Sequence, residues 1–186
     1  MTLSVLDLFV LSMLDRGCQT PYDLQRQAGL SLGGTVPALR RLIKAGLLTC
    51  VDDETGTKRP RHHYRLTALG KERARKGWKE YLSGAKIPAD LDSILRLADL
   101  AAHYRAPKIQ IATFLKQAAQ TRQRLVDEAN LARAHRGRTA ASSYVAFRLF
   151  LDIERFAAEA SVLTRLAAGF KNSMSVHPDN EPLAGL

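Results

Sequence analysis

The sequence contains few of the features that cross-link a chain or anchor it in a membrane. Its 186 residues include only two cysteines, Cys18 and Cys50, which is too few for a disulfide framework. No stretch stays apolar for the ~18 residues that a membrane-spanning helix needs. The N-terminal segment also lacks the basic start and the small-residue cleavage site of a signal peptide. These absences predict a cytoplasmic chain with reduced thiols and no membrane partner.

Patterns of catalytic and metal-binding residues are lacking as well. Neither cysteine lies in a Cys-x-x-Cys or Cys/His arrangement, so a zinc site is not predicted. The adjacent His62 and His63 fall in a segment that we expect to be a strand, where neighbouring side chains point to opposite faces. The sequence shows no nucleophile elbow and no plausible carboxylate pair. We therefore expect no enzymatic activity, no metal and no cofactor.

Acidic residues are in deficit. Asp and Glu number 18 against 28 Lys and Arg, which leaves a formal net charge of +10. Such a surplus favours a polyanionic partner, because phosphates neutralised by Lys and Arg release counterions. Hydrophobic residues make up 46% of the chain, which is ordinary for a folded globular protein. The composition thus indicates a globular protein with an affinity for nucleic acid.

Three helices are predicted in the first part of the chain. Apolar residues at spacings of three and four predict an amphipathic helix over 3–15. Thr20 and Pro21 are typical first residues of a second helix, which should end at Gly29. Thr35 is expected to cap a third helix.

A hairpin and a fourth helix are predicted next. Two short β-like runs, 47–51 and 62–66, enclose a long loop with turn-forming residues and a basic tip. Residues 67–83 then carry the pattern of a further helix, weakened in its middle by Gly77. Three helices followed by a hairpin are the order of a winged helix-turn-helix.

Basic residues gather on the third helix and at the hairpin tip. A helix fits the major groove of B-DNA, where Arg pairs with guanine through a bidentate fork, and a basic loop can lie on the backbone or in the minor groove. We expect double-stranded DNA to be bound by Thr35, Val36, Pro37, Arg40, Arg41, Lys44, Lys58, Arg59, Arg61 and His62.

Two other functions remain open at this point. The winged helix could be a protein-interaction adaptor without sequence-specific DNA binding, its basic face docking an acidic partner. It could also bind RNA, although the hairpin tip carries no aromatic residue for base stacking. A solvated helix face explains Arg40, Arg41 and Lys44 equally well if they are taken alone.

The segments LFVLSMLDRG, TPYDLQRQAG, GGTVPALRRLIKAGLL and RPRHHYRLTALGKE resemble the PadR family of transcriptional regulators. The resemblance covers roughly residues 5–82. It implies a dimeric regulator from a bacterium or archaeon, usually a repressor, with a C-terminal helical arm that forms the dimer. Two positions depart from the family pattern: Val36 stands where an aromatic residue, usually Tyr, is common, and Pro21 stands where Gly is frequent.

Two long helices, over 107–135 and 139–170, are predicted after a shorter one over 90–104. Each long helix has apolar residues alternating by three and four, which is a heptad seam. The two seams could pair with each other in one chain or with their copies in a second subunit, and a palindromic DNA site favours the homodimer. The residues expected to form the dimer are Leu149, Ile153, Phe156 and Leu163.

These patterns predict a mainly α protein in three parts. Residues 1–83 form a winged-helix DNA-binding domain, 84–170 a helical dimerisation domain and 171–186 a flexible tail. Trp78 and Tyr81 are candidates for a pocket that binds a small aromatic effector, as the resemblance implies, with core packing as the alternative.

Overall fold

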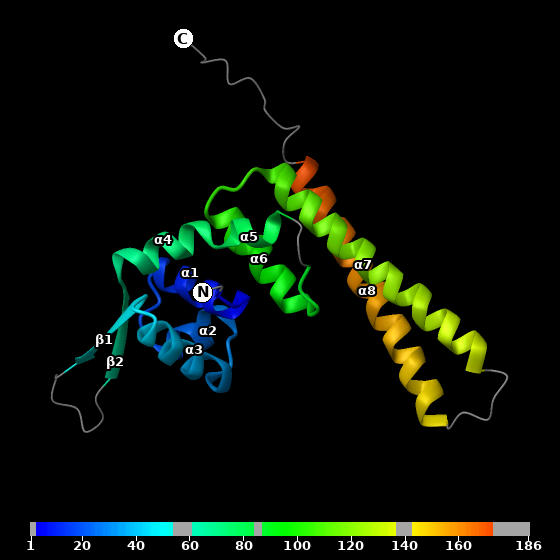
Figure 1. Cartoon of the computed structure of the whole chain (residues 1–186), viewed down its shortest axis with the longest axis horizontal. Helices are drawn as coiled ribbons and strands as arrows, with labels where there is room; N and C mark the ends of the chain where they lie inside the picture. Colours follow the sequence, from blue (N-terminus) through cyan, green and yellow to red (C-terminus); the bar gives the residue numbers. More distant parts are fainter. Residues whose placement is uncertain (1–2, 54–60, 84–86, 137–142, 173–186) are drawn as a thin grey trace, which may run out of the picture. The chain divides into compact units, whose positions relative to one another are not determined.

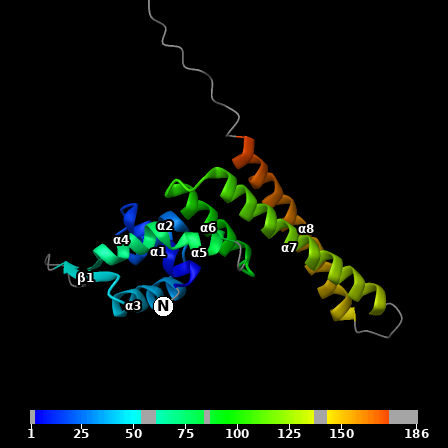
Figure 2. The same cartoon turned by 45° about the horizontal axis from the view of Figure 1, so that its top comes forward.

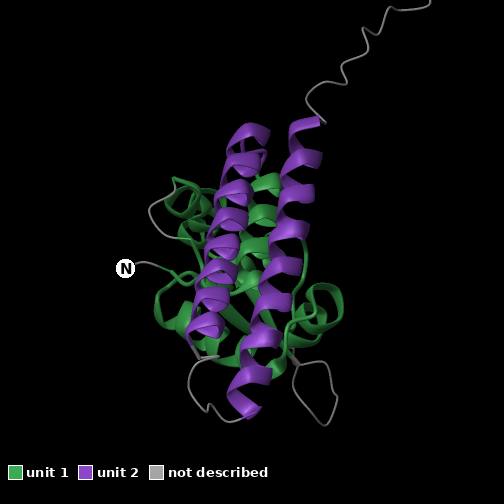
Figure 3. Ribbon diagram, turned by 90° about the vertical axis from the view of Figure 1, so that its right-hand side faces the viewer, with its two compact units in different colours: residues 1–104 green, residues 105–186 purple. Residues whose placement is uncertain are grey.

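The computed structural model describes residues 3–53, 61–83, 87–136 and 143–172. Within these residues the protein is mainly helical, with a two-stranded antiparallel sheet (Figure 1). The elements are α1 (Val5–Asp15), α2 (Pro21–Ala28), α3 (Leu32–Lys44), β1 (Leu48–Asp53), β2 (Arg61–Leu66), α4 (Ala68–Lys76), α5 (Trp78–Leu82), α6 (Leu91–His103), α7 (Lys108–Arg136) and α8 (Ser143–Asn172). The chain divides into two compact units, residues 1–104 and 105–186, which Figure 3 draws in different colours.

Helix α1 is the centre of the first unit. Ser4 caps it through a capping box with Asp7, in which each side chain accepts a hydrogen bond from the other residue's backbone N–H. The sequence predicted an amphipathic helix, but α1 is buried on nearly every side. The reason is that α2, α3, α4 and α6 all pack around it.

Helix α2 confirms the sequence prediction in detail. Thr20 caps it, Pro21 occupies its first turn, and Gly29 ends it in the left-handed conformation with φ of 63°. Only Leu24 of this helix is buried, so α2 contributes one anchor to the core and leaves most of its surface in solvent.

Helix α3 begins earlier than predicted. Its N-cap is Ser31, whose Oγ accepts a hydrogen bond from the N–H of Gly34 at 3.3 Å. The prediction that Thr35 caps this helix is wrong. Thr35 lies inside the first turns, fully buried, and its hydroxyl donates to the carbonyl of Ser31 at 2.8 Å.

Strands β1 and β2 form the predicted antiparallel hairpin. Leu48 pairs with Leu66 at its base and Asp53 with Arg61 at the last described pair. Leu47 and Leu48 are buried in the core with α1 and α3, so the base of the hairpin is anchored in the first unit.

The predicted helix over 67–83 is two helices, α4 and α5, separated at Gly77. A side chain at Gly77 would collide with the side chain of Leu8, so this glycine permits a close approach between α1 and the chain that passes over it.

Helix α6 belongs to the first unit. It packs on α1 and α5 and buries Ile94, Leu97 and Leu100. The division of the chain therefore lies between Tyr104 and Arg105, not at the predicted boundary between 83 and 84.

The second unit is a hairpin of two long helices. Figures 1 and 2 both show α7 and α8 side by side along their length. The buried residues of the two helices include these positions of the predicted heptad seams: Ile111, Leu115, Ala118, Arg122, Ile153, Ala160, Leu163 and Ala167. Helix α7 also buries residues that the seam did not predict: Ala112, Phe114, Ala119 and Val126.

The residues predicted to form the dimer lie in this intrachain seam. Ile153 and Leu163 are buried in the single chain, and Leu149 and Phe156 are half-buried. Ile153 and Leu163 are therefore covered within one chain, whereas a dimer contact through the half-buried Leu149 and Phe156 stays a prediction.

No helix in the described ranges combines the length and the apolar character that crossing a membrane demands. The predicted tail over 171–186 falls almost entirely outside the described residues, since α8 ends at Asn172.

Candidate nucleic-acid interface

Helix α3, called the reading helix from here on, has one buried and one exposed face. Ala38, Leu39 and Leu42 are at most 1% exposed and anchor its inner face in the core. Four residues at spacings of three and four are exposed on the opposite face: Gly33, Pro37, Arg40 and Lys44. The core therefore holds the helix rigidly while two of its cations face outward.

Thr35 and Val36 lie away from the centre of that outer face. Thr35 is fully buried, so we remove it from the expected DNA contacts. Val36 is half-buried at the edge of the face. Pro37 is exposed beside Arg40, as the helical spacing requires.

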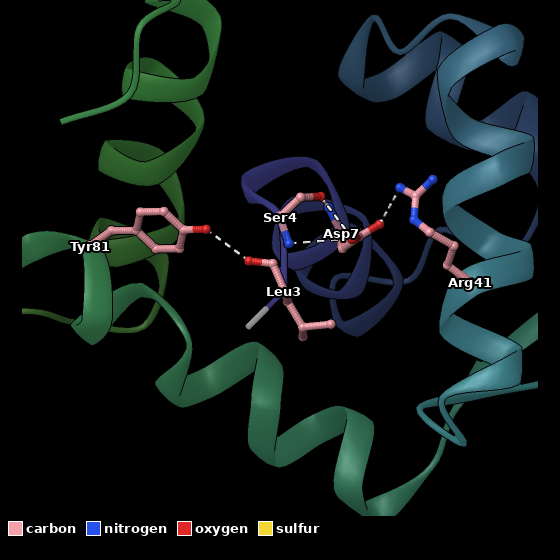
Figure 4. Close-up of polar contacts among 5 residues, drawn as sticks. All are labelled: Leu3, Ser4, Asp7, Arg41 and Tyr81. Atoms are coloured by element: carbon pink, nitrogen blue, oxygen red, sulfur yellow. Dashed lines mark hydrogen bonds and ion pairs between the residues drawn. The ribbon is translucent and has the colours of Figure 1, made fainter. Parts of the chain in front are cut away.

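Arg41 is oriented by an acidic residue. Its Nη2 lies 2.7 Å from Oδ1 of Asp7 in the first turn of α1, and its side chain remains 50% exposed (Figure 4). The Asp7 side chain is only 8% exposed. Its Oδ2 also accepts hydrogen bonds from the Ser4 hydroxyl at 2.7 Å and the Ser4 N–H at 3.3 Å.

The hairpin contributes only part of the predicted contact set to the described structure. Lys58 and Arg59 lie outside the described residues. Arg61 is the first residue of β2, and the exposed His62 follows it. The base of the hairpin is thus placed beside the reading helix, with its basic tip beyond the described part of the chain.

Tyr22 is a surface residue that sequence reasoning did not select. It is 66% exposed at the start of α2. Together with Pro21, Leu32 and His62 it lines an open hollow of about 700 Å³ formed by α2, the start of the reading helix and β2. The sequence could have indicated Tyr22, because it is an aromatic residue in the first turn of a short helix with few apolar residues.

The capping box of α2 lies beside the same hollow. The Thr20 hydroxyl donates to Oδ2 of Asp23 at 2.8 Å, and the backbone N–H of Gln19 donates to the same oxygen at 3.2 Å. These bonds lower the pKa of Asp23. Its negative charge is therefore held at the N-terminal end of the helix dipole.

Trp78 and Tyr81 have different surroundings among the described residues. Trp78 is buried, and its Nε1–H donates to the carbonyl of Arg75 at 2.9 Å. The Tyr81 hydroxyl donates to the carbonyl of Leu3 at 2.8 Å (Figure 4). Tyr81 lines a hollow of about 570 Å³ with Leu6 and Pro88, and Trp78 is not among the lining residues.

The two cysteines differ in their surroundings. Cys18 is buried and Cys50 is exposed on β1. Burial, followed by the nearby charge of Asp23, raises the pKa of the Cys18 thiol. No group of three His, Cys, Asp or Glu residues suited to a metal ion occurs among the residues that the structure describes.

Comparisons with known proteins give a likeness among solved structures. No family model matches the chain, and no curated protein sequence matches it. Among solved structures, the chain is similar to Bacillus subtilis PadR in complex with operator DNA, at 19% identity and a TM-score of 0.37, over 89% of this chain and 99% of that one. A TM-score of this size does not establish a shared fold.

Proposed function

We propose that the protein is a cytoplasmic transcription regulator, a repressor that binds a palindromic operator in double-stranded DNA as a homodimer. The observation that carries this proposal is the outer face of the reading helix. Arg40 and Lys44 project from a helix whose inner face is locked into the core. A helix with such a face can enter the major groove, where Arg reads guanine and Lys contacts phosphate.

The surroundings of the reading helix support the same function. The hairpin base and the start of α2 lie next to it, which places Tyr22 and His62 on the adjoining surface. The loop beyond that base carries Lys58 and Arg59 in the sequence. Several cations on one surface give the phosphate contacts on which affinity for DNA mainly depends.

A random-site selection with duplex DNA tests the proposal. The full chain is expected to enrich one sequence, and Arg40→Ala with Lys44→Ala is expected to abolish that enrichment while the chain stays folded. The matched control is Lys71→Ala with Arg75→Ala, which removes two exposed cations at the same spacing from α4. If the wild-type chain enriches no sequence, the adaptor function is favoured and the regulator function fails.

The hairpin tip has its own test. Lys58→Ala with Arg59→Ala is expected to weaken binding to the selected duplex and to flatten the dependence of log K on log salt by up to about 0.9 per lost phosphate contact. A slope equal to that of the wild type would remove the tip from the interface.

We place the proposed dimer contact on a face of α8 other than the one predicted. Tyr144, Phe147 and Leu151 follow one another at spacings of three and four, and each is at least 60% exposed. Leu131 of α7 is exposed to a similar degree. A second copy of this chain is the proposed occupant, because two identical apolar faces bury each other and a dimer matches the two halves of a palindrome.

Sedimentation of the full chain tests this contact. Phe147→Ser with Leu151→Ser is expected to convert a dimer into a monomer with unchanged helix content. Ala157→Ser with Ala158→Ser introduces the same residue type at two other exposed positions of α8 and is the control, which should remain a dimer. A wild-type monomer, or a Phe147 and Leu151 variant that remains a dimer, would contradict the assignment. An aromatic effector is not part of the proposed function.

A further inference from the structure

The ion pair between Asp7 and Arg41 joins the core of the first unit to the edge of the proposed DNA surface. On the reading helix, Arg41 follows Pro37 by four residues and precedes Lys44 by three, so all three are neighbours on the helix surface. Arg41 therefore flanks the outer face, on the side that turns toward α1 (Figure 4).

Asp7 is itself held in place. It is buried, its backbone N–H donates to the Ser4 hydroxyl at 3.1 Å, and Ser4 donates to its carboxylate through both Oγ and the backbone N–H. A carboxylate fixed in this way presents one oxygen, Oδ1, to Arg41 in a defined direction. The capping box of α1 thus also fixes the position of the carboxylate that binds Arg41 of the reading helix.

The pairing leaves Arg41 able to make a second contact. Asp7 engages one terminal nitrogen of the guanidinium, and the side chain is still half exposed. A guanidinium carries five N–H donors in a rigid fork. An arginine side chain that is free to rotate loses much conformational entropy when it binds. The fixed Asp7 carboxylate already restricts Arg41 in the free protein, so a smaller entropy loss remains for the binding step.

We propose that Asp7 is a specificity-determining positioning residue, which holds the Arg41 guanidinium so that its exposed edge contacts a guanine in the major groove. This inference rests on the proposed function and adds to it a residue from α1, outside the helix-turn-helix. Asp7 itself touches no DNA; it acts through Arg41. The Asp7 carboxylate is buried and paired with a cation, which weakens its repulsion of the phosphates.

The test is a random-site selection of duplex DNA with the full chain and three variants: Asp7→Asn, Arg41→Ala and the double variant. Asparagine keeps an oxygen that can accept from Ser4 but loses the charge that orients Arg41. Both single variants are expected to lose the preference for one guanine in each half-site by about tenfold. The double variant is expected to lose no more than either, because both changes act on one contact.

Asp99→Asn is the matched control. It breaks an ion pair with Arg16 that has the same N–O distance, 2.7 Å, in the same unit. It is expected to leave every base preference unchanged. Thermal unfolding followed by circular dichroism checks that each variant is folded, and if Asp7→Asn does not fold, the half-exposed Arg41 still permits the test through Arg41→Ala and Arg41→Lys.

Failure of the role of Asp7 and failure of the proposed DNA-binding function give different results. If the wild type selects a sequence and Asp7→Asn selects the same one with the same base preferences, Asp7 does not position Arg41 for DNA and the inference is overturned, whatever Arg41→Ala does. If the wild type selects nothing, the proposed function fails and the inference with it.

Discussion

The two units of this protein bury an ion pair in different ways. In the first unit, buried Asp7 pairs with Arg41, whose side chain is half in solvent. In the second, Arg122 is 2% exposed and its partner Glu159 only 15%, so both charges lie inside the seam of the α7–α8 hairpin. The half-exposed Arg41 can contact a further molecule, whereas Arg122 has almost no exposed surface with which to do so.

The units also differ in how completely they cover their apolar residues. The first surrounds α1 with helices and a hairpin and forms a continuous aliphatic core. The second has only two helices within the described ranges, and Tyr144, Phe147 and Leu151 stay exposed on α8. The first unit exposes large apolar side chains as well, among them Tyr22, Leu32 and Leu69, but only α8 carries three such residues on one face at helical spacing within the described ranges.

The largest expected effect comes from breaking the buried pair of the hairpin. Glu159→Ala should lower the free energy of unfolding of the hairpin by about 3–5 kcal/mol, because it removes the carboxylate that faces the buried Arg122 charge. Urea unfolding followed by circular dichroism measures the loss. Glu154→Ala, at an exposed position of α8, is the control, and an equal loss in both variants would contradict the role of the pair.

A glycine-to-alanine change should have opposite signs in the two units. At Gly70 an added side chain would collide with the carbonyl oxygen of Leu47, so Gly70→Ala should destabilise the first unit by about 1–3 kcal/mol. At Gly169 of α8 an added Cβ meets no atom within 4 Å. Gly169→Ala should therefore stabilise the helix by about 0.5–1 kcal/mol.

Thermal unfolding of the two variants measures both changes. A loss of stability at Gly169 as large as that at Gly70 would show that the difference in packing between the units is smaller than the structure indicates.

The smallest effect is expected from titrating Tyr104 of the first unit. Burial, together with the hydrogen bond from its hydroxyl to Oδ2 of Asp15 at 3.0 Å, raises the pKa of Tyr104 to about 12. A tyrosine in the unfolded chain has a pKa of about 10. The stabilisation from the protonated hydroxyl is therefore fully present below pH ~10 and is lost as the pH rises through the folded pKa.

Urea unfolding at a series of alkaline pH values tests this expectation. Tyr104→Phe should flatten the decline in stability over that window. A decline that is equally steep in Tyr104→Phe would assign the alkaline sensitivity to other groups.

Local signals were sufficient for several elements. Thr20, Pro21 and Gly29 predicted both ends of α2, because capping and left-handed backbone depend on neighbouring residues alone. The same logic misplaced the start of α3. Ser31 and Thr35 are both residues that cap helices, and only the packing of Thr35 into the core shows that it lies within the helix.

The sequence predicted which cations of α3 are exposed, but it did not predict which residues they contact. The basic character and the exposed positions of Arg40 and Lys44 follow from helical spacing. The partner of Arg41 does not, since Asp7 lies 34 residues earlier in the chain. The heptad seam of α8 could also be predicted from the sequence. The helix that packs against it could not, because such a seam fits a helix of the same chain or of a second one.

By itself the sequence determined most of the succession of helices and strands, both ends of α2, the surplus of positive charge and the apolar stripes. These depend on the periodicity of the backbone and on residues close together in the chain. Only the tertiary structure decided that α6 belongs with the first unit, that Asp7 meets Arg41 and that α7 takes the stripe of α8. Each of these is a choice of partner over a long stretch of chain, and partners are chosen by shape and charge in space.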